Sequence, residues 1–344
     1  MDLLKRLSEA ASVPGHEGKI RGIIEEELKG IVDEFKVDPL GNLIAHKEGS
    51  GPAVLIAAHM DEIGFIVKHV EEETGFIRIH PLGGFDVKTL IAQRVIVHTE
   101  GGDLIGAIGS KPIHIMTEEE RKKLPELKDL FVDLGLPAEE VKKRVTVGDP
   151  ITLRQDFVEL EDVVSGKALD DRAGVYIGIE AIKRAKKFGC DLYFAGTTQE
   201  EVGLRGARVA GFSVHPVIGI ALDTTLAVDV PGAQPGERIT ALGKGVAIKL
   251  TDSASISHPG LVKEMRRIAE ERKIPYQMEI LPRGGTDAGA IQLAREGVAA
   301  VTLSLPTRYV HSVVETAHKD DLEAAIGLLA AFIEEAGSVD LRLR

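Results

Sequence analysis

The sequence predicts an α/β protein with a mostly parallel sheet, helices on both faces of that sheet, and a small inserted β-barrel-like domain. From about residue 159 onward, strand-like apolar runs alternate with helical stretches, as in a parallel sheet covered by helices. Residues 66–158 instead read mostly as short strands with turns. A chain of 344 residues is also long for one core. We therefore expect one domain from residues 1–65 and 159–344, interrupted by a β-rich domain at 66–158.

The individual elements follow from the spacing of apolar residues. Residues 18–28 place Ile20, Ile24 and Leu28 at helical intervals, and residues 1–6 suit an amphipathic helix. Within the insertion we expect strands at 75–80, 94–98 and 104–108 and a polar helix at 117–124. Beyond it, the predicted helices cover 171–187, 259–272, 286–296 and 320–336.

Composition excludes several classes of protein. A formal net charge of −12 disfavours binding to nucleic acid, whose phosphates would repel the chain. No run of eighteen apolar residues occurs, so we expect no membrane span, and the N-terminus lacks the apolar core of a signal peptide. Cys190 is the only cysteine, which precludes an intrachain disulfide and fits a cytoplasmic location. Asn42 is the only asparagine, and such depletion of thermolabile amides suggests a hyperthermophile.

Five strand-like apolar runs each lead to a side chain that can bind a metal. Ligands of open α/β sheets bind outside the carboxyl ends of the strands, so these side chains should meet at one edge. Nitrogen and oxygen donors of this kind suit Zn²⁺, Co²⁺ or Mn²⁺. Taken singly, each residue could equally be a helix cap or a satisfied strand-end group. The five positions are His59, Asp170, the pair Glu200 and Glu201, Asp223, and His311.

The adjacent carboxylates of Glu200 and Glu201 are the most informative feature. They follow the apolar run 191–196, and charge at the end of a buried strand is costly unless something compensates it. Neighbouring residues on an extended segment point in opposite directions. One glutamate can therefore bind a metal while the other faces the substrate as a base. A solvated surface pair is the alternative for an acidic protein.

Six motifs in this order resemble the TET-type dinuclear metallo-aminopeptidases, also called glutamyl-aminopeptidase-like or deblocking aminopeptidases. The resemblance covers nearly the whole chain, and the motifs are highly specific in combination. They lie at residues 57–61 (AAHMD), 168–174 (ALDDRAG), 199–207 (QEEVGLRGA), 221–223 (ALD), 284–289 (GGTDAG) and 308–312 (RYVHS).

The resemblance implies a role for each matching residue. Asp170 would bridge two divalent metals, Zn or Co, with His59 and Asp223 completing one site and Glu201 and His311 the other. Glu200 would be the general base and acid, and Asp61 would orient the ring of His59. The bond between Asp170 and Asp171 would be a cis peptide. All these residues are present, so nothing in the motifs indicates an inactive enzyme.

The resemblance also implies a reaction and an assembly. The reaction would be hydrolysis of the first peptide bond of short peptides by a water activated between two metals. The inserted domain would make dimer contacts, and dimers would build a dodecamer. A glycoside hydrolase is less suited to this chain, because aromatic content is only 4% with no Trp and the histidines would be unexplained. A non-catalytic scaffold on the same fold is the third possibility.

The residues that shape the substrate site are less determined. Gly285 and Thr286 are weak candidates for substrate binding, and either Thr286 or Asp287 could cap the following helix. Loops at 228–240 and 251–258 should shape the pocket for the first residue, with candidate charges at Asp229, Arg238, Asp252 and Arg283. His258 lies near this presumed pocket without an assigned role. The side-chain preference therefore stays open.

Overall fold

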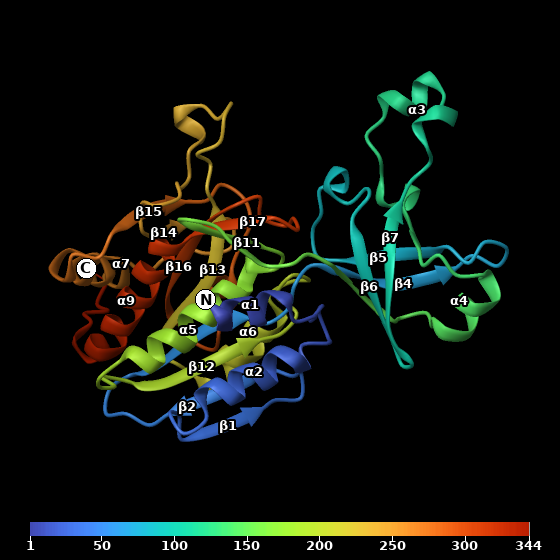
Figure 1. Ribbon diagram of the computed structural model, residues 1–344. Helices are drawn as coiled ribbons and strands as arrows, with labels where there is room; N and C mark the ends of the chain where they lie inside the picture. Colours follow the sequence, from blue (N-terminus) through green and yellow to red (C-terminus); the bar gives the residue numbers. More distant parts are fainter. Residues whose placement is uncertain (344) are drawn as a thin grey trace.

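The computed structural model describes residues 1–343 and has two parts (Figure 1). A large α/β domain carries both termini, and a small β-barrel stands beside it. An arm, residues 110–130, projects from the barrel. This confirms the predicted fold class. The chain enters the barrel after β3 (Ala53–His59) and leaves it before β10 (Val158–Glu159).

The sheet of the α/β domain has eleven strands. Its centre is the parallel array β12–β3–β13–β16, and β14 and β15 also pair in parallel. The edges are antiparallel, so the predicted parallel order holds for the centre and the sheet as a whole is mixed. The other strands are β1 (Glu34–Val37), β2 (Leu43–Lys47), β11 (Val163–Gly166), β12 (Asp191–Thr197), β13 (Ile218–Leu226), β14 (Val246–Thr251), β15 (Tyr276–Ile280), β16 (Ala299–Arg308) and β17 (Glu315–His318).

Helices cover both faces of this sheet. One face is covered by α1 (Asp2–Glu9), α2 (Gly18–Leu28), α5 (Leu169–Arg184), α7 (Pro259–Arg272) and α9 (Lys319–Glu335), which enclose the main hydrophobic core. On the other face, α6 (Arg205–Val214) and α8 (Asp287–Gln292) pack together over a smaller core.

Two helices of the α/β domain are shorter than the sequence predicts. The helix expected at 286–296 ends at Gln292, since Arg295 has a φ of 49° in the left-handed region, where an α-helix cannot continue. The helix expected at 171–187 ends at Arg184, and Ala185 is already extended. At its start, Asp170 and Asp171 have non-helical backbone angles, which kinks α5 at the point where the functional residues lie.

The inserted part is a closed six-stranded barrel in the order β4–β5–β8–β7–β6–β9. Alternate side chains of its strands fill a separate hydrophobic core. The polar helix of the arm is only α3 (Glu118–Lys122), fixed by a capping box between Thr117 and Glu120. The strands are β4 (Gly64–Val70), β5 (Ile77–Leu82), β6 (Arg94–Thr99), β7 (Gly102–Gly109), β8 (Phe131–Asp133) and β9 (Pro150–Leu153), and α4 (Ala138–Arg144) packs outside them.

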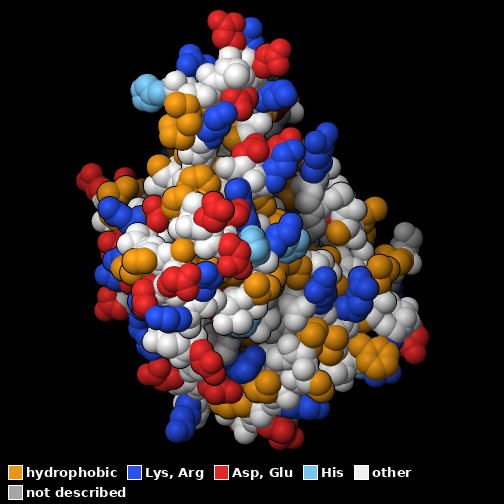
Figure 2. Space-filling model, turned by 90° about the vertical axis from the view of Figure 1, so that its right-hand side faces the viewer, with side chains coloured by type: hydrophobic (Ala, Val, Ile, Leu, Met, Phe, Trp, Pro, Cys, Tyr) orange, Lys and Arg blue, Asp and Glu red, His pale blue; other side chains and the backbone are white. Residues whose placement is uncertain are grey.

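Charged side chains of both signs cover the barrel side of the molecule, with hydrophobic side chains between them (Figure 2). On the arm, the hydrophobic side chains of Ile113, Ile115 and Leu124 are strongly exposed. Within residues 1–343, no helix is both long and apolar enough to cross a membrane.

Candidate active site

Potential metal ligands converge where the parallel strands and their loops meet. His59 is the last residue of β3, and Asp223 lies inside β13, which continues to Leu226 alongside β16. Asp170 lies in the kinked start of α5. Glu201 follows β12 in a turn, and His311 lies in the loop between β16 and β17. Parallel register therefore brings together residues that are far apart in the sequence.

These residues form two ligand groups that share Asp170. His59, Asp170 and Asp223 make one group, and Asp170, Glu201 and His311 make the other. His59 Nε2 lies 3.2 Å from Asp170 Oδ1, and His311 Nε2 lies 3.4 Å from Asp170 Oδ2. His311 Nε2 is also 3.3 Å from Glu201 Oε1. The two oxygens of one carboxylate thus face different histidines.

The geometry and the donor types of both groups fit divalent metals. Two ligands bound tetrahedrally at about 2.1 Å lie about 3.4 Å apart, close to the observed nitrogen–oxygen separations. Imidazole and carboxylate are ordinary donors for zinc and its neighbours. Among the residues described, Glu201 Oε1 is buried and accepts no hydrogen bond. A bound cation would satisfy that oxygen.

The electrostatics of the site show an excess of negative charge. Burial raises the pKa of Asp223 well above its usual range, and the nearby Asp170 raises it further. Burial likewise raises the pKa of Glu200, with Asp223 adding to the effect. Burial alone would lower the pKa of His311, but contacts with Asp170 and Glu201 outweigh it and raise that pKa to about 12. Buried carboxylates of this kind need a compensating cation to stay ionised.

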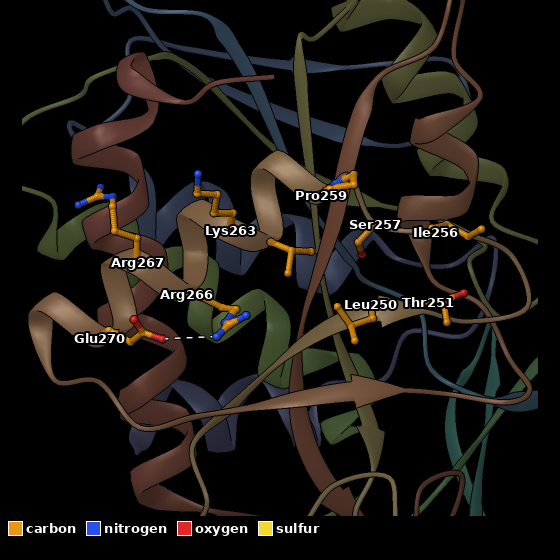
Figure 3. A pocket seen from close by; sticks show the side chains of 10 residues that line it. Leu250, Thr251, Ile256, Ser257, Pro259, Lys263, Arg266, Arg267 and Glu270 are labelled. Carbon is orange, nitrogen blue, oxygen red and sulfur yellow. Dashed lines mark ion pairs between the residues drawn. The ribbon is translucent and has the colours of Figure 1, made fainter. Parts of the chain in front are cut away.

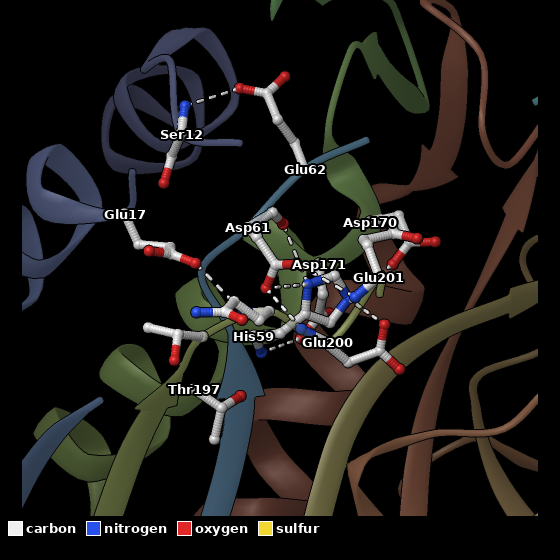
Figure 4. A network of polar contacts seen from close by, with 12 residues as sticks. Ser12, Glu17, His59, Asp61, Glu62, Asp170, Asp171, Thr197, Glu200 and Glu201 are labelled. Carbon is white, nitrogen blue, oxygen red and sulfur yellow. Dashed lines mark hydrogen bonds and ion pairs between the residues drawn. The ribbon is translucent and has the colours of Figure 1, made fainter. Parts of the chain in front are cut away.

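Asp61 organises the turn that carries the two glutamates (Figure 4). Its carboxylate accepts hydrogen bonds from the backbone N–H of Glu200 at 3.0 Å and of Glu201 at 3.1 Å. The ring of His59 is contacted by Asp61 through the backbone carbonyl, 3.0 Å from Nδ1, while the carboxylate oxygen lies 3.6 Å away. Asp61 therefore contacts the His59 ring, as the resemblance implies, through its backbone carbonyl.

The two glutamates lie in a turn, not on the extended strand end, and they diverge within it. Glu200 Oε2 is 3.9 Å from His59 Nε2, whereas Glu201 Oε1 approaches His311. Gln199, which precedes them, has a left-handed φ of 56°. The turn directs one carboxylate to each histidine.

Asp171 connects the two segments that carry His59 and Asp170. The peptide bond between Asp170 and Asp171 is cis. Asp171 Oδ2 accepts a hydrogen bond from the backbone N–H of His59 at 3.2 Å, and its Oδ1 accepts one from Gly174. The chain thus ties the end of β3 to the start of α5.

A pocket of about 490 Å³ opens over the ligands, within the range of about 300–1,000 Å³ typical of small-ligand sites. Gly285 and Thr286 line it, as the sequence suggests, and Arg283 stands on its rim. Thr286 also caps α8 by accepting a hydrogen bond from Ala288 N–H. The acidic side chains that line this pocket, within residues 1–343, are Asp170, Glu200, Glu201 and Asp223.

Three buried charged residues near the site have contacts that sequence reasoning does not predict. Lys249 lines the pocket with a fully buried side chain, and its Nζ lies 3.1 Å from Glu279 Oε1. Asp287 is buried and accepts a hydrogen bond from Thr197 Oγ1 at 2.5 Å. Glu315 is buried and accepts hydrogen bonds from the backbone N–H groups of Asp170 and His311. Of these three residues, Lys249 had a signal in the sequence, because a lysine inside the apolar run of β14 is unusual.

The barrel contributes a glycine pair to the edge of the site. A Cβ on Gly83 would lie 3.3 Å from Glu201 Oε2 and 2.6 Å from Ile63 Cγ2. A Cβ on Gly84 would lie 3.6 Å from His311 Nδ1. The loop after β5 can therefore approach Glu201 this closely only with glycine at position 83, whereas a Cβ at position 84 would make ordinary van der Waals contact with His311.

Other candidates from the sequence lie elsewhere. Asp229 pairs with Arg308 at 2.6 Å, and neither it nor Arg238 lines the pocket. Asp252 lies behind the pocket wall, 3.6 Å from Lys249 Nζ. His258 caps α7, because its Nδ1 accepts a hydrogen bond from Gly260 N–H at 3.1 Å. A separate groove of about 740 Å³ runs along α7 and contains none of the ligands (Figure 3).

The sequence profile of the M42 glutamyl aminopeptidase family matches residues 41–328. The chain belongs to this family. An M42 relative, the putative aminopeptidase of Acetivibrio thermocellus, is 42% identical over 96% of this chain and 98% of its own length. The lysyl aminopeptidase of Pyrococcus furiosus is 38% identical over 98% of both chains.

A solved structure agrees with this assignment. The TET1 peptidase of Pyrococcus horikoshii is 35% identical, covers 97% of this chain and 99% of its own, and superimposes with a TM-score of 0.87. Family and relatives together identify the M42 chain as a metal-dependent aminopeptidase, a hydrolase of peptide bonds. The M42 family also implies divalent metals, for which the two ligand groups are suited.

Proposed function

We propose that the chain binds two divalent cations, Zn²⁺ or Co²⁺, and removes the N-terminal residue of short peptides. His59, Asp170 and Asp223 would hold one cation, and Asp170, Glu201 and His311 the other. The observation that supports this most is the shared carboxylate, whose oxygens lie 3.2 Å and 3.4 Å from two different histidines. A bridging carboxylate between two such groups is typical of two-metal hydrolases.

The chain's own residues would carry the proton transfers. When bound, the cations supply Lewis-acid polarisation of the scissile carbonyl and of the attacking water. Glu200 would accept the proton of that water at a carboxylate oxygen and later donate it to the leaving amine. Asp61 would hold Glu200 in place, since it accepts the backbone N–H bonds of the turn.

The free α-amino group of the substrate would give the enzyme its exopeptidase character. The bound cations and the carboxylates that line the pocket would together hold this amino group. A blocked N-terminus would lose this contact. Gly285 and Thr286 would flank the bound residue.

We further propose that the barrel domain, residues 66–158, makes dimer contacts and that dimers build a dodecamer. Support comes from the exposed arm, where Ile113, Ile115 and Leu124 are 60%, 67% and 74% exposed. Apolar side chains at such exposure are usual at interfaces. The related TET1 peptidase can assemble into a tetrahedron or a large octahedral shell. Sedimentation of the metal-loaded chain as a monomer alone would reject this assembly.

The decisive experiment compares unblocked and amino-blocked aminoacyl substrates. Chelated enzyme would be assayed before and after addition of Zn²⁺, Co²⁺ or Mn²⁺, with metal content measured in parallel. We expect cleavage of the unblocked set only, and only with metal. Equal cleavage of blocked substrates would refute the role of the α-amino group, and full activity in the chelated enzyme would refute the role of the cations.

A further inference from the structure

Glu315 is a buried carboxylate for which the proposed reaction has no use. It is the first residue of β17 and follows His311 by four positions. Its side chain is 2% exposed and does not line the pocket over the ligands. Substrate therefore has no access to it, so any role in the reaction must act through other residues.

Each oxygen of Glu315 accepts a hydrogen bond from the backbone of one ligand residue. Oε1 accepts the N–H of His311 at 2.7 Å, and Oε2 accepts the N–H of Asp170 at 2.9 Å. No Lys, Arg or His within residues 1–343 forms an ion pair with this carboxylate. Buried carboxylates persist where hydrogen bonds compensate their desolvation, and here both bonds come from ligand-bearing segments.

Both of those segments have backbone conformations that require outside support. His311 has a left-handed φ of 62°, and Tyr309, two residues earlier, has one of 60°. Ala168, two residues before Asp170, is also left-handed at 55°. Non-glycine residues remain in this region only where the surroundings hold them there. One segment is the start of α5 and the other is the loop between β16 and β17, and they meet at Glu315.

We propose that Glu315 is a positioning residue that fixes Asp170 and His311 relative to each other and so sets cation affinity at the group Asp170, Glu201 and His311. This inference rests on the proposed two-cation function. The carboxylate has a fixed span between its oxygens, so it holds the two main-chain segments at a fixed separation. The Nε2 of His311 then stays 3.4 Å from Asp170 Oδ2. The group with His59 and Asp223 shares only Asp170 and depends on Glu315 less.

Two substitutions test the two bonds. Glu315→Gln keeps the shape but presents an NH₂ group to one of the backbone donors, so one hydrogen bond is lost. Glu315→Asp keeps both oxygens, but its shorter side chain cannot reach the backbone N–H groups of both segments. Thr316→Val is a matched control on the same strand, because Thr316 Oγ1 bonds Ser165 and Val314 and touches no ligand.

The measurement is a Co²⁺ titration of the chelated full-length enzyme, followed by visible absorption and calorimetry. The wild-type enzyme and Thr316→Val should each bind two ions per chain. The affinity of each binding event should be the same in the control variant as in the wild type. In both Glu315 variants, one binding event should weaken about 10–100-fold, the range for supporting partners of metal ligands, while the other changes less. Excess Co²⁺ should restore kcat towards the wild-type value with KM little changed.

The remaining outcomes overturn the inference. Unchanged titrations in both variants would refute the role of Glu315 and leave the two-cation function standing. Equal weakening of both events, or failure of both variants to fold, would show that Glu315 serves the fold in general and not one ligand group. Absence of binding in the wild type would refute the two-cation function itself and this inference with it, so the two failures are distinguishable.

Discussion

Replacing Glu200 with Gln removes the proposed proton acceptor while leaving the shape of its side chain. The other carboxylates that line the pocket, Asp170, Glu201 and Asp223, all belong to the ligand groups and would be occupied by cations. No substitute base is then present in the pocket. We therefore expect the upper end of general-base effects, a loss of about 10⁴-fold in kcat or about 5.4 kcal/mol.

The assay is hydrolysis of an unblocked aminoacyl p-nitroanilide at saturating metal, with the metal content of each preparation measured. Glu17→Gln is the matched control. Glu17 is buried beside the same turn, and its Oε1 accepts the backbone N–H of Gly15 at 2.7 Å and of Gln199 at 3.2 Å. An amide oxygen can replace that acceptor, so kcat should stay within a few fold. Glu200→Gln with full metal content and more than a tenth of wild-type kcat would refute the assignment of the base.

Two further predictions concern stability and reactivity. Gly178→Ala should destabilise the protein by about 1–3 kcal/mol, because the new Cβ would lie 2.3 Å from the buried ring of Phe194, whereas Gly22→Ala, with nothing within 4 Å, should stabilise it by about 0.5–1 kcal/mol. Urea denaturation of both variants would check this, and equal effects would contradict the packing argument. Burial raises the pKa of Cys190 to about 12, so the reactive thiolate is scarce below that pH and a thiol reagent at pH 8 should label it only after unfolding. Rapid labelling of the folded enzyme would contradict its burial.

The sequence predicts that these ligands meet, because each follows or interrupts an apolar run, whereas their division into two groups is implied only by the resemblance to the aminopeptidase family. His59 and Asp223 lie on neighbouring parallel strands, and parallel strands carry their carboxyl ends to one edge. The same logic could not give the antiparallel edges of the sheet. β17 is only four residues long and pairs with β11 and β16, which lie on either side of it. Pairings of such short strands depend on the assembled core.

The supporting residues differ in how far sequence patterns could indicate them. Glu315 binds two backbone groups whose nearness exists only after folding, so its position in the sequence carries no signal. Lys249 lies within an apolar strand, β14. A lysine at such a position would ordinarily point to solvent from an edge strand. Instead it is fully buried beside Glu279 of the neighbouring strand. A charge of each sign in two adjacent strands is a pattern that could have indicated the pair.

The insertion of the barrel within the ligand sequence has a consequence for synthesis on the ribosome. The barrel strands lie between Gly64 and Leu153 and close on their own hydrophobic core, so this part can fold while later residues are still being added. Within residues 1–343, β3, which carries His59, pairs with β12 and β13, both made after the barrel. His311 emerges later still. The group Asp170, Glu201 and His311 therefore cannot form before translation is nearly complete, so the proposed two-cation site stays incomplete in the nascent chain.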